Sequence, residues 1–224
     1  MTLTLYYSTI CPYAQRARLA VREAGIDVDE VGIDLRNKPE WYTRDINPAG
    51  KVPALKLDDG EILVESLVIA QYILEKHDAS SRLIPEDPLT RARIRLWIER
   101  LGSFIPSIYG VIKAEEGGEQ QARDNFLAAA RQLNTELERV SGEGPYIFGD
   151  QFTLADIVSA PHLVSLETLE RYNGFTIPDT REYARLNALR KTLRERPSVQ
   201  QILPSYDEMV ASYERLRARY AAAK

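Results

Sequence analysis

The sequence has one cysteine, two histidines and no long hydrophobic run. One cysteine cannot form a disulfide within the chain, which excludes a disulfide framework. His77 and His162 lie far apart without metal-ligand spacing to Cys11, which argues against a transition-metal site and a Ser-His-Asp triad. The longest hydrophobic run covers residues 126–130, whereas a membrane helix needs about 20 apolar residues and a secretory signal about 7–15. We therefore expect no metal, no membrane association, no secretory signal and a reducing, cytoplasmic setting.

An excess of positive charge is also missing. Lys and Arg number 29 against 33 Asp and Glu, which leaves a formal charge of −4. A dedicated nucleic-acid-binding protein shows a basic surface, so we expect no nucleic-acid partner. The 224 residues suffice for one large domain or two small ones, and 44% hydrophobic with 28% charged residues is typical of an ordinary soluble protein.

The periodicity of the chain changes near residue 78. Before it, short strand signals at 3–7, 28–33, 54–57 and 62–64 alternate with helix signals at 12–24, 39–44 and 66–76. After it, helical periodicity predominates, with segments near 94–112, 126–140, 153 onward, 180–195 and 205–220. The pattern predicts an α/β domain over residues 1–78, a connector over 79–88 and an all-α domain over 89–224.

Cys11 lies where the first strand passes into the first helix, beside Pro12. The unpaired N–H groups and the dipole of a helix N-terminus favour a thiolate, and cysteines so placed have pKa values of about 3.5–7.5. The position therefore indicates a reactive thiol rather than an inert buried one. Ala14 stands where a dithiol motif would have its second cysteine, so a disulfide formed by Cys11 needs an external thiol, most simply glutathione. Arg16, Arg18 and Arg22 follow on the same helix. Assistance of a thiolate by their charge is one interpretation, and a solvated helix face is the favoured one.

Several short motifs, in order and at family spacing, resemble those of cytosolic glutathione transferases. The similarity is greatest to the omega class, with the plant lambda class a close relative. It covers almost the whole chain and implies a thioredoxin-like N-terminal domain followed by a helical domain. The motifs that carry it are Cys11-Pro12-Tyr13-Ala14-Gln15-Arg16, Asn37-Lys38-Pro39-Glu40-Trp41, Asn47-Pro48-x-Gly50-Lys51-Val52-Pro53, Glu65-Ser66, Leu83-Ile84-Pro85, Ile105-Pro106-Ser107 and Phe152-Thr153-Leu154-Ala155-Asp156.

The resemblance implies a glutathione site. Ser66, at a helix start, would hold the γ-glutamyl carboxylate and Glu65 the ammonium group, although the same pair also suits simple helix capping. Val52, before a Pro53 that the family holds in cis, would pair with the cysteinyl unit through its backbone. Lys38 and Lys51 would bind the glycyl carboxylate, with solvated surface lysines as the alternative. Tyr13 would line the site beside the thiol.

A second-substrate pocket and a dimer are further implications. Pro106 should kink the long helix beside the site and open a pocket. The alternative is that the apolar residues of this helix belong to the hydrophobic core. The family also implies a homodimer. Thr153 and Asp156, in contrast, read as a structural capping box. The residues predicted to line the pocket are Leu101, Phe104, Ile105, Ile108 and Tyr109.

The sequence thus predicts a glutathione-dependent thiol transferase in which Cys11 forms a mixed disulfide with glutathione. Its substrate would be small and hydrophobic or glutathionylated, and dehydroascorbate reduction would follow the same cycle. Two alternatives stay open. One is conjugation of glutathione to electrophiles, and the other is non-enzymatic carriage of hydrophobic ligands.

Overall fold

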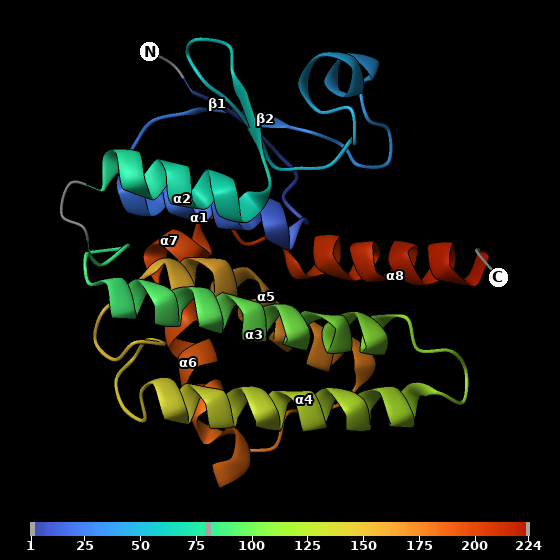
Figure 1. Cartoon of the computed structure of the whole chain (residues 1–224). Coiled ribbons are helices and arrows are strands. Elements are labelled where there is room, and N and C mark those ends of the chain that lie inside the picture. Colours follow the sequence, from blue (N-terminus) through green and yellow to red (C-terminus); the bar gives the residue numbers. More distant parts are fainter. Residues whose placement is uncertain (1–2, 79–81, 223–224) are drawn as a thin grey trace.

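The computed structural model describes residues 3–78 and 82–222 (Figure 1). The first part of the chain has the predicted order of strands and helices, with boundaries that agree to within one residue outside the segment 39–44. A π-helical turn replaces the predicted helix at 39–44. The elements are β1 (Thr4–Tyr7), α1 (Pro12–Ala24), β2 (Asp29–Gly32), η1 (Tyr42–Ile46), β3 (Ala54–Lys56), β4 (Ile62–Val64) and α2 (Ser66–His77).

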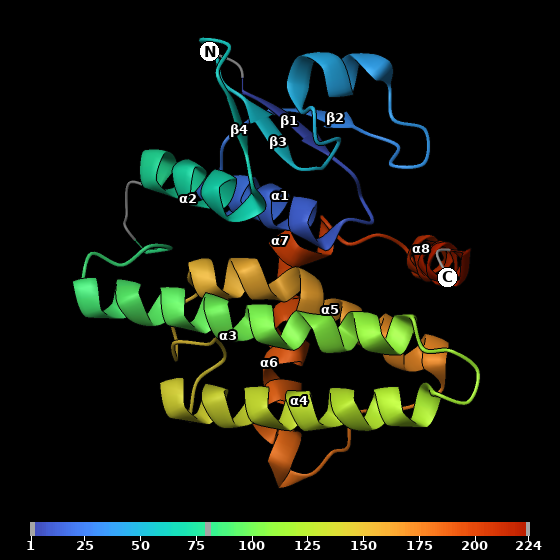
Figure 2. The same ribbon diagram turned by 45° about the vertical axis from the view of Figure 1, so that its right-hand side comes forward.

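These strands form one mixed sheet in the order β2-β1-β3-β4. β1 runs parallel to β2 and antiparallel to β3, where Leu5 lies opposite Leu55. Because side chains alternate along a strand, Leu5 and Leu55 face one side, while Tyr6 and Ala54 face the other. The first pair joins the cluster with α1 and α2, and the second packs near η1. The sheet therefore has α1 and α2 on one face and η1 on the other (Figure 2).

The second part of the chain is helical, as predicted. The segment of the predicted connector at 79–81 lies outside the described residues, and α3 begins at Pro88 and continues through Pro106. The sequence pattern missed the short helix α7 and the first turns of α3 and α4, whereas η2 lies within the helical segment predicted at 180–195. The elements are α3 (Pro88–Ile112), α4 (Glu119–Val140), α5 (Leu154–Asn173), η2 (Arg181–Tyr183), α6 (Ala184–Glu195), α7 (Pro197–Gln200) and α8 (Tyr206–Ala222). None of the described helices is long and apolar enough to cross a membrane.

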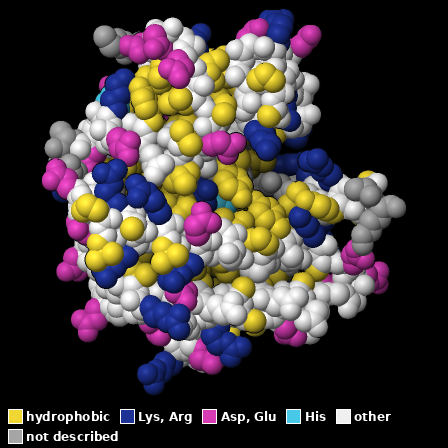
Figure 3. All heavy atoms as spheres, viewed as in Figure 1, with side chains coloured by type: hydrophobic (Ala, Val, Ile, Leu, Met, Phe, Trp, Pro, Cys, Tyr) yellow, Lys and Arg dark blue, Asp and Glu magenta, His cyan; other side chains and the backbone are white. Residues whose placement is uncertain are grey.

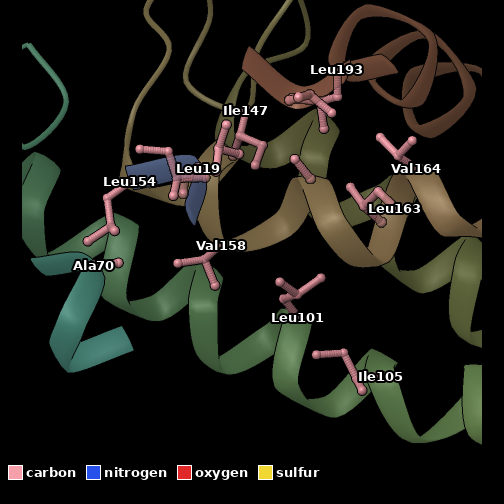
Figure 4. Packing of buried hydrophobic residues seen from close by; sticks show 14 of the residues in the cluster. Leu19, Ala70, Leu101, Ile105, Ile147, Leu154, Val158, Leu163, Val164 and Leu193 are labelled. Atoms are coloured by element: carbon pink, nitrogen blue, oxygen red, sulfur yellow. The ribbon is translucent and has the colours of Figure 1, made fainter. Parts of the chain in front are cut away.

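One hydrophobic core passes through the boundary between the two parts. Leu19 of α1 and Ala70 of α2 belong to the same buried cluster as Val158 of α5 and Leu101 of α3. Figure 4 shows these side chains converging from the four helices. Since α1 carries Cys11 at its start, this shared core holds the cysteine in a fixed position relative to the helical domain.

The capping box of α5 is confirmed. Thr153 is its N-cap, and the fully buried carboxylate of Asp156 accepts hydrogen bonds from the backbone N–H groups of Thr153 and Ile147, each at 2.9 Å, and from the Thr153 hydroxyl at 3.2 Å. These bonds tie the loop before α5 to the helix N-terminus. Burial nevertheless raises the pKa of Asp156 to about 6, because a dry environment penalises the charged form.

Candidate active site

Cys11 is the N-cap residue of α1. Its extended backbone (φ −88°, ψ 112°) leads from β1 into the helix, and Pro12 occupies the first helical turn. The Cys11 N–H donates to the carbonyl of Ser8 at 3.1 Å, and its side chain caps no N–H of the helix. The thiol points across to the backbone of Val52, with its Sγ 3.8 Å from the Val52 carbonyl oxygen.

Two opposing influences act on the Cys11 thiol. Burial is the larger and raises its pKa above the ordinary value of 9.0. The backbone N–H groups of Ala14 and Tyr13, and the charge of Arg16, lower the pKa. The expectation of a net lowered pKa is therefore wrong, whereas the expected influence of the helix start is present with its predicted sign.

Arg16 and Arg18 do not lie on a solvated helix face. Both are buried, because α1 packs against the sheet on one side and α5 on the other. Arg18 pairs with Glu30 at 3.1 Å. Arg16 donates from Nε to the Val158 carbonyl at 2.9 Å and has no carboxylate within ion-pair distance in the part of the chain that the structure describes.

The ring of Tyr13 lies between Arg16 and His162. The Arg16 guanidinium carbon is 4.9 Å from the centre of the Tyr13 ring, and the buried His162 ring meets its edge at 5.2 Å. Burial lowers the pKa of His162 well below its usual range, with Arg16 acting in the same direction, so the imidazole is neutral. Sequence reasoning placed Tyr13 beside the thiol but gave no role to His162, because nothing local in the sequence brings α5 beneath the start of α1.

An open cleft of about 600 Å³ lies in front of Cys11. In Figure 3, hydrophobic side chains gather in the hollow between the sheet-containing domain and the helical domain, with Lys and Arg side chains beside it over α8. The structure brings all the residues predicted for the thiol and for glutathione together around this one cleft. They are Cys11, Tyr13, Lys38, Lys51, Val52, Pro53, Glu65 and Ser66.

Two side chains fix the backbone just before Val52, and the sequence analysis assigned this role to neither of them. The Tyr42 hydroxyl donates to the Lys51 carbonyl at 2.6 Å, and the Asn47 amide donates to the same oxygen at 2.8 Å. The Val52–Pro53 peptide is cis, as the resemblance implies. Tyr42 lies eleven residues before Pro53, and no local signal marks it for this role, because burial cannot be read from one sequence.

Glu65 has φ +68°, and no other non-glycine residue within 3–78 and 82–222 has a positive φ. It is exposed at the N-cap position of α2, while Ser66 begins the helix and is 7% exposed. Non-glycine residues in this region cost about 1–3 kcal/mol and cluster at functional sites. The strained backbone therefore points to a binding role for Glu65 more than to simple capping, for which no side-chain hydrogen bond exists.

Lys38 and Lys51 are exposed at the cleft and have no carboxylate within ion-pair distance among the described residues. Lys38 extends across Gly50, whose left-handed backbone (φ +62°) leaves room for it. A Cβ at Gly50 would lie 3.1 Å from Lys38 Nζ. The glycine thus lets the lysine approach the cleft.

Most residues predicted for a second-substrate pocket do not reach the cleft. Leu101, Phe104, Ile105 and Ile108 are at most 6% exposed and belong to the core, where Figure 4 shows Leu101 and Ile105 pointing toward α5. Only Tyr109 is half-buried near the site, where burial raises its pKa to about 12 and Tyr13, Cys11 and Arg16 act on it. The helix turns its apolar face inward, and periodicity alone does not distinguish core from cleft.

The cleft also has walls that the sequence analysis missed. Arg219 comes from α8, more than 150 residues after the other lining residues, and no local motif marks it. Within the described ranges, no group of three or more His, Cys, Asp or Glu residues is placed to hold a metal ion. The additional lining residues are Leu35, Asn47, Ala49, Gly50, Val64 and Arg219.

Comparisons with known proteins agree with this geometry. Two family models match, described as glutathione S-transferase N-terminal domain over residues 5–81 and C-terminal domain over residues 92–202. The chain is 30% identical over 210 residues to glutathione S-transferase U22 of Arabidopsis thaliana, covering 93% of each. It is 28% identical to the probable glutathione S-transferase DHAR1, cytosolic, of Oryza sativa subsp. japonica, covering 91% of this chain and 88% of the relative. The crystal structure of glutathione transferase Omega 1C from Trametes versicolor has a TM-score of 0.80 and 30% identity, covering 98% of this chain and 97% of that one.

Proposed function

This chain belongs to the glutathione S-transferase family, and we propose that within the family it acts as a thiol transferase of the omega type. The observation that carries the proposal is the position of Cys11. The only thiol of the chain lies at a helix start, in the same cleft as every residue predicted to bind glutathione. Resemblance of the cysteine motif to the omega class, and 30% identity to an omega structure, support the class.

Glutathione carries two carboxylates, an ammonium group and a backbone that can pair like a strand. In our proposal Ser66 and the N-terminus of α2 bind the γ-glutamyl carboxylate, and Glu65 binds the ammonium group. Val52 pairs with the cysteinyl unit through its backbone, which directs the sulfur of glutathione toward Cys11. Lys38 and Lys51 bind the glycyl carboxylate.

The reaction is two successive thiol–disulfide exchanges. The Cys11 thiolate attacks the glutathione sulfur of a mixed disulfide GS–SR, which forms Cys11–S–SG and releases RS⁻, and this anion takes up a proton. A glutathione thiolate then attacks the Cys11 sulfur–sulfur bond, which restores the Cys11 thiolate and yields GSSG. The sum is GS–SR + GSH → GSSG + RSH. The resemblance also implies reduction of dehydroascorbate by two glutathione molecules. That reaction would again use the Cys11 thiol and the thiol of glutathione.

Replacement of Cys11 by Ser tests the proposal. The variant should lose reduction of glutathione mixed disulfides, and the wild-type protein should gain one glutathionyl unit by mass when incubated with oxidised glutathione. Unchanged disulfide reduction in Cys11→Ser would refute the mechanism. Conjugation of an aromatic halide by the wild type without any adduct at Cys11 would favour a conjugating transferase, and tight binding of an apolar dye without either activity would favour a carrier.

We further propose that the protein works as a cytoplasmic homodimer. The family resemblance supports the dimer, and Val68 on α2 and Leu89 and Leu96 on α3, each about half exposed, are available to be covered by a second copy. Light scattering should give twice the mass of the chain. A monomer at micromolar concentration would contradict the assembly and leave the thiol chemistry untouched.

A further inference from the structure

We propose that Arg219 makes the cleft selective for second substrates that carry a carboxylate. The inference rests on the proposed thiol transfer and names the chemistry of the partner thiol RS. Its basis is the position of Arg219 on a helix that contributes nothing else to the cleft, together with the charges around Cys11.

α8 is a largely exposed helix with only Met209 and Tyr213 buried. In both ribbon views it lies between the level of the sheet and that of α3 (Figures 1 and 2). Its C-terminal end is held to the end of α3. Lys113 Nζ lies 3.7 Å from the centre of the Tyr220 ring, and Arg217 reaches the Ala114 carbonyl at 3.5 Å.

Helical spacing then directs Arg219 toward the cleft. Residues 215 and 219 are one turn apart and share a face of α8. Arg215 lines the neighbouring groove beside Leu35, and Arg219 lines the cleft of Cys11, to which Leu35 also belongs. Arg217 and Tyr220 face the opposite groove, next to the end of α3. The contacts that hold α8 are therefore separate from the face that carries Arg219.

The charged residues of the cleft include one cation more than the charged groups of glutathione need. Lys38, Lys51 and Arg219 are positive and Glu65 is negative, so the lining carries a net charge of +2. Glutathione with its thiol protonated carries two carboxylates and one ammonium group, a net charge of −1, and in the proposed arrangement residues 38–66 meet all three. Arg219 has no carboxylate within ion-pair distance among the described residues. The remaining positive charge lies on α8, outside residues 38–66, and in our proposal it is the charge left to meet the RS group.

An acidic group on RS would thus find a guanidinium close to Cys11, while the glutathione half of the same disulfide stays on the first domain. Guanidinium binds carboxylate through two parallel hydrogen bonds, which would also orient the sulfur–sulfur bond. At an exposed position such a pair is worth a few-fold in rate and weakens as salt rises.

The first test compares two mixed disulfides of glutathione, one with 3-mercaptopropionate and one with 2-mercaptoethanol. Arg219→Ala should lower kcat/KM for the acidic disulfide about fivefold at low salt and leave the neutral one unchanged. Arg219→Lys should retain most of the preference. Arg215→Ala is the matched control, because it removes the same charge one turn away, and its ratio of the two rates should equal that of the wild type.

A second measurement does not depend on turnover. Iodoacetate and iodoacetamide alkylate the same thiol and differ in a carboxylate, and Cys11 is the only cysteine. Any change in the pKa of Cys11 affects both reagents equally, so their rate ratio reports attraction of the carboxylate. Arg219→Ala should lower the iodoacetate-to-iodoacetamide ratio three- to fivefold, and Arg215→Ala should not.

Two results would overturn the inference. The first is an equal loss on both disulfides together with a higher KM for glutathione, which would assign Arg219 to glutathione itself. The second is an unchanged alkylation ratio in Arg219→Ala. Absence of turnover in the wild-type protein would refute the proposed thiol transfer, while the alkylation ratio would still decide the role of Arg219.

Discussion

The reactivity of Cys11 should rise steeply with pH. Burial raises the pKa of this thiol above 9.0, and the reactive species is the thiolate. The thiol is then protonated at neutral pH, and the thiolate fraction grows about tenfold with each pH unit until the pKa is reached. Alkylation by iodoacetamide should therefore accelerate about 100-fold between pH 7 and pH 9 without a plateau.

The assay is unambiguous because the chain has one cysteine, so the mass of the intact protein reports only Cys11. The pseudo-first-order rate is measured at each pH and divided by that of free glutathione under the same conditions. A plateau below pH 8 would refute the reasoning, since it would mean that the helix N-terminus and Arg16 outweigh burial.

Arg16 provides the corresponding perturbation within the protein. Its buried charge lowers the pKa of Cys11, so Arg16→Met should raise that pKa further and slow alkylation at pH 8 by about three- to tenfold. Arg18→Met is the matched control, because Arg18 lies on the same helix and is equally buried but pairs with Glu30. Equal alkylation rates in the two variants, with melting temperatures matched, would show that Arg16 acts through packing alone.

Three further predictions concern the supports of the site. Asp156→Ala should lower the free energy of unfolding by about 3 kcal/mol in urea titration, because it leaves buried N–H donors without an acceptor; a loss below 1 kcal/mol would contradict this. Tyr42→Phe removes one of two hydrogen bonds to the Lys51 carbonyl, so it should cost only about 1 kcal/mol of stability yet raise the KM for glutathione. An unchanged KM would show that this hydrogen bond does not contribute to glutathione binding. Gly50→Ala, at a positive φ and against Lys38, should cost about 1–2 kcal/mol and weaken glutathione binding measured by calorimetry; full affinity would show that the position of Lys38 is unimportant.

Local chemistry explains why the position of Cys11 could be predicted from the sequence, whereas the contacts expected at Val52, Glu65 and Ser66 came from the family resemblance. Pro12 at the first turn and Gly25 in the left-handed conformation at the end are local signals, and they define α1 and hence the N-cap position of Cys11. Glu65 and Ser66 likewise lie at a helix start that the pattern marks. Each of these residues owes its place to its immediate neighbours along the chain.

Residues whose role depends on tertiary packing were not predictable in this way. Leu101 and Ile105 repeat with a helical period that suits either a core or a cleft, and only the position of α5 assigns them to the core. Arg16 was expected on a solvated face, yet it is buried against α5, and its charge acts on the thiol. The lowered pKa expected for Cys11 failed for the same reason, because burial is a property of the folded chain.

The position of Cys11 has two consequences that oppose each other. A partly buried thiol at low thiolate fraction reacts slowly with random electrophiles, which protects the only cysteine of the chain. The same low-dielectric surroundings strengthen the pull of the α1 N–H groups and of Arg16 on any negative charge that develops at the sulfur. A substrate that is held by its glutathione half on residues 38–66, with its sulfur aligned toward Cys11, gains from proximity what the thiol lacks in thiolate fraction. In the proposed mechanism, reactivity in this cleft therefore depends on correct binding of the glutathione half more than on the intrinsic acidity of the thiol.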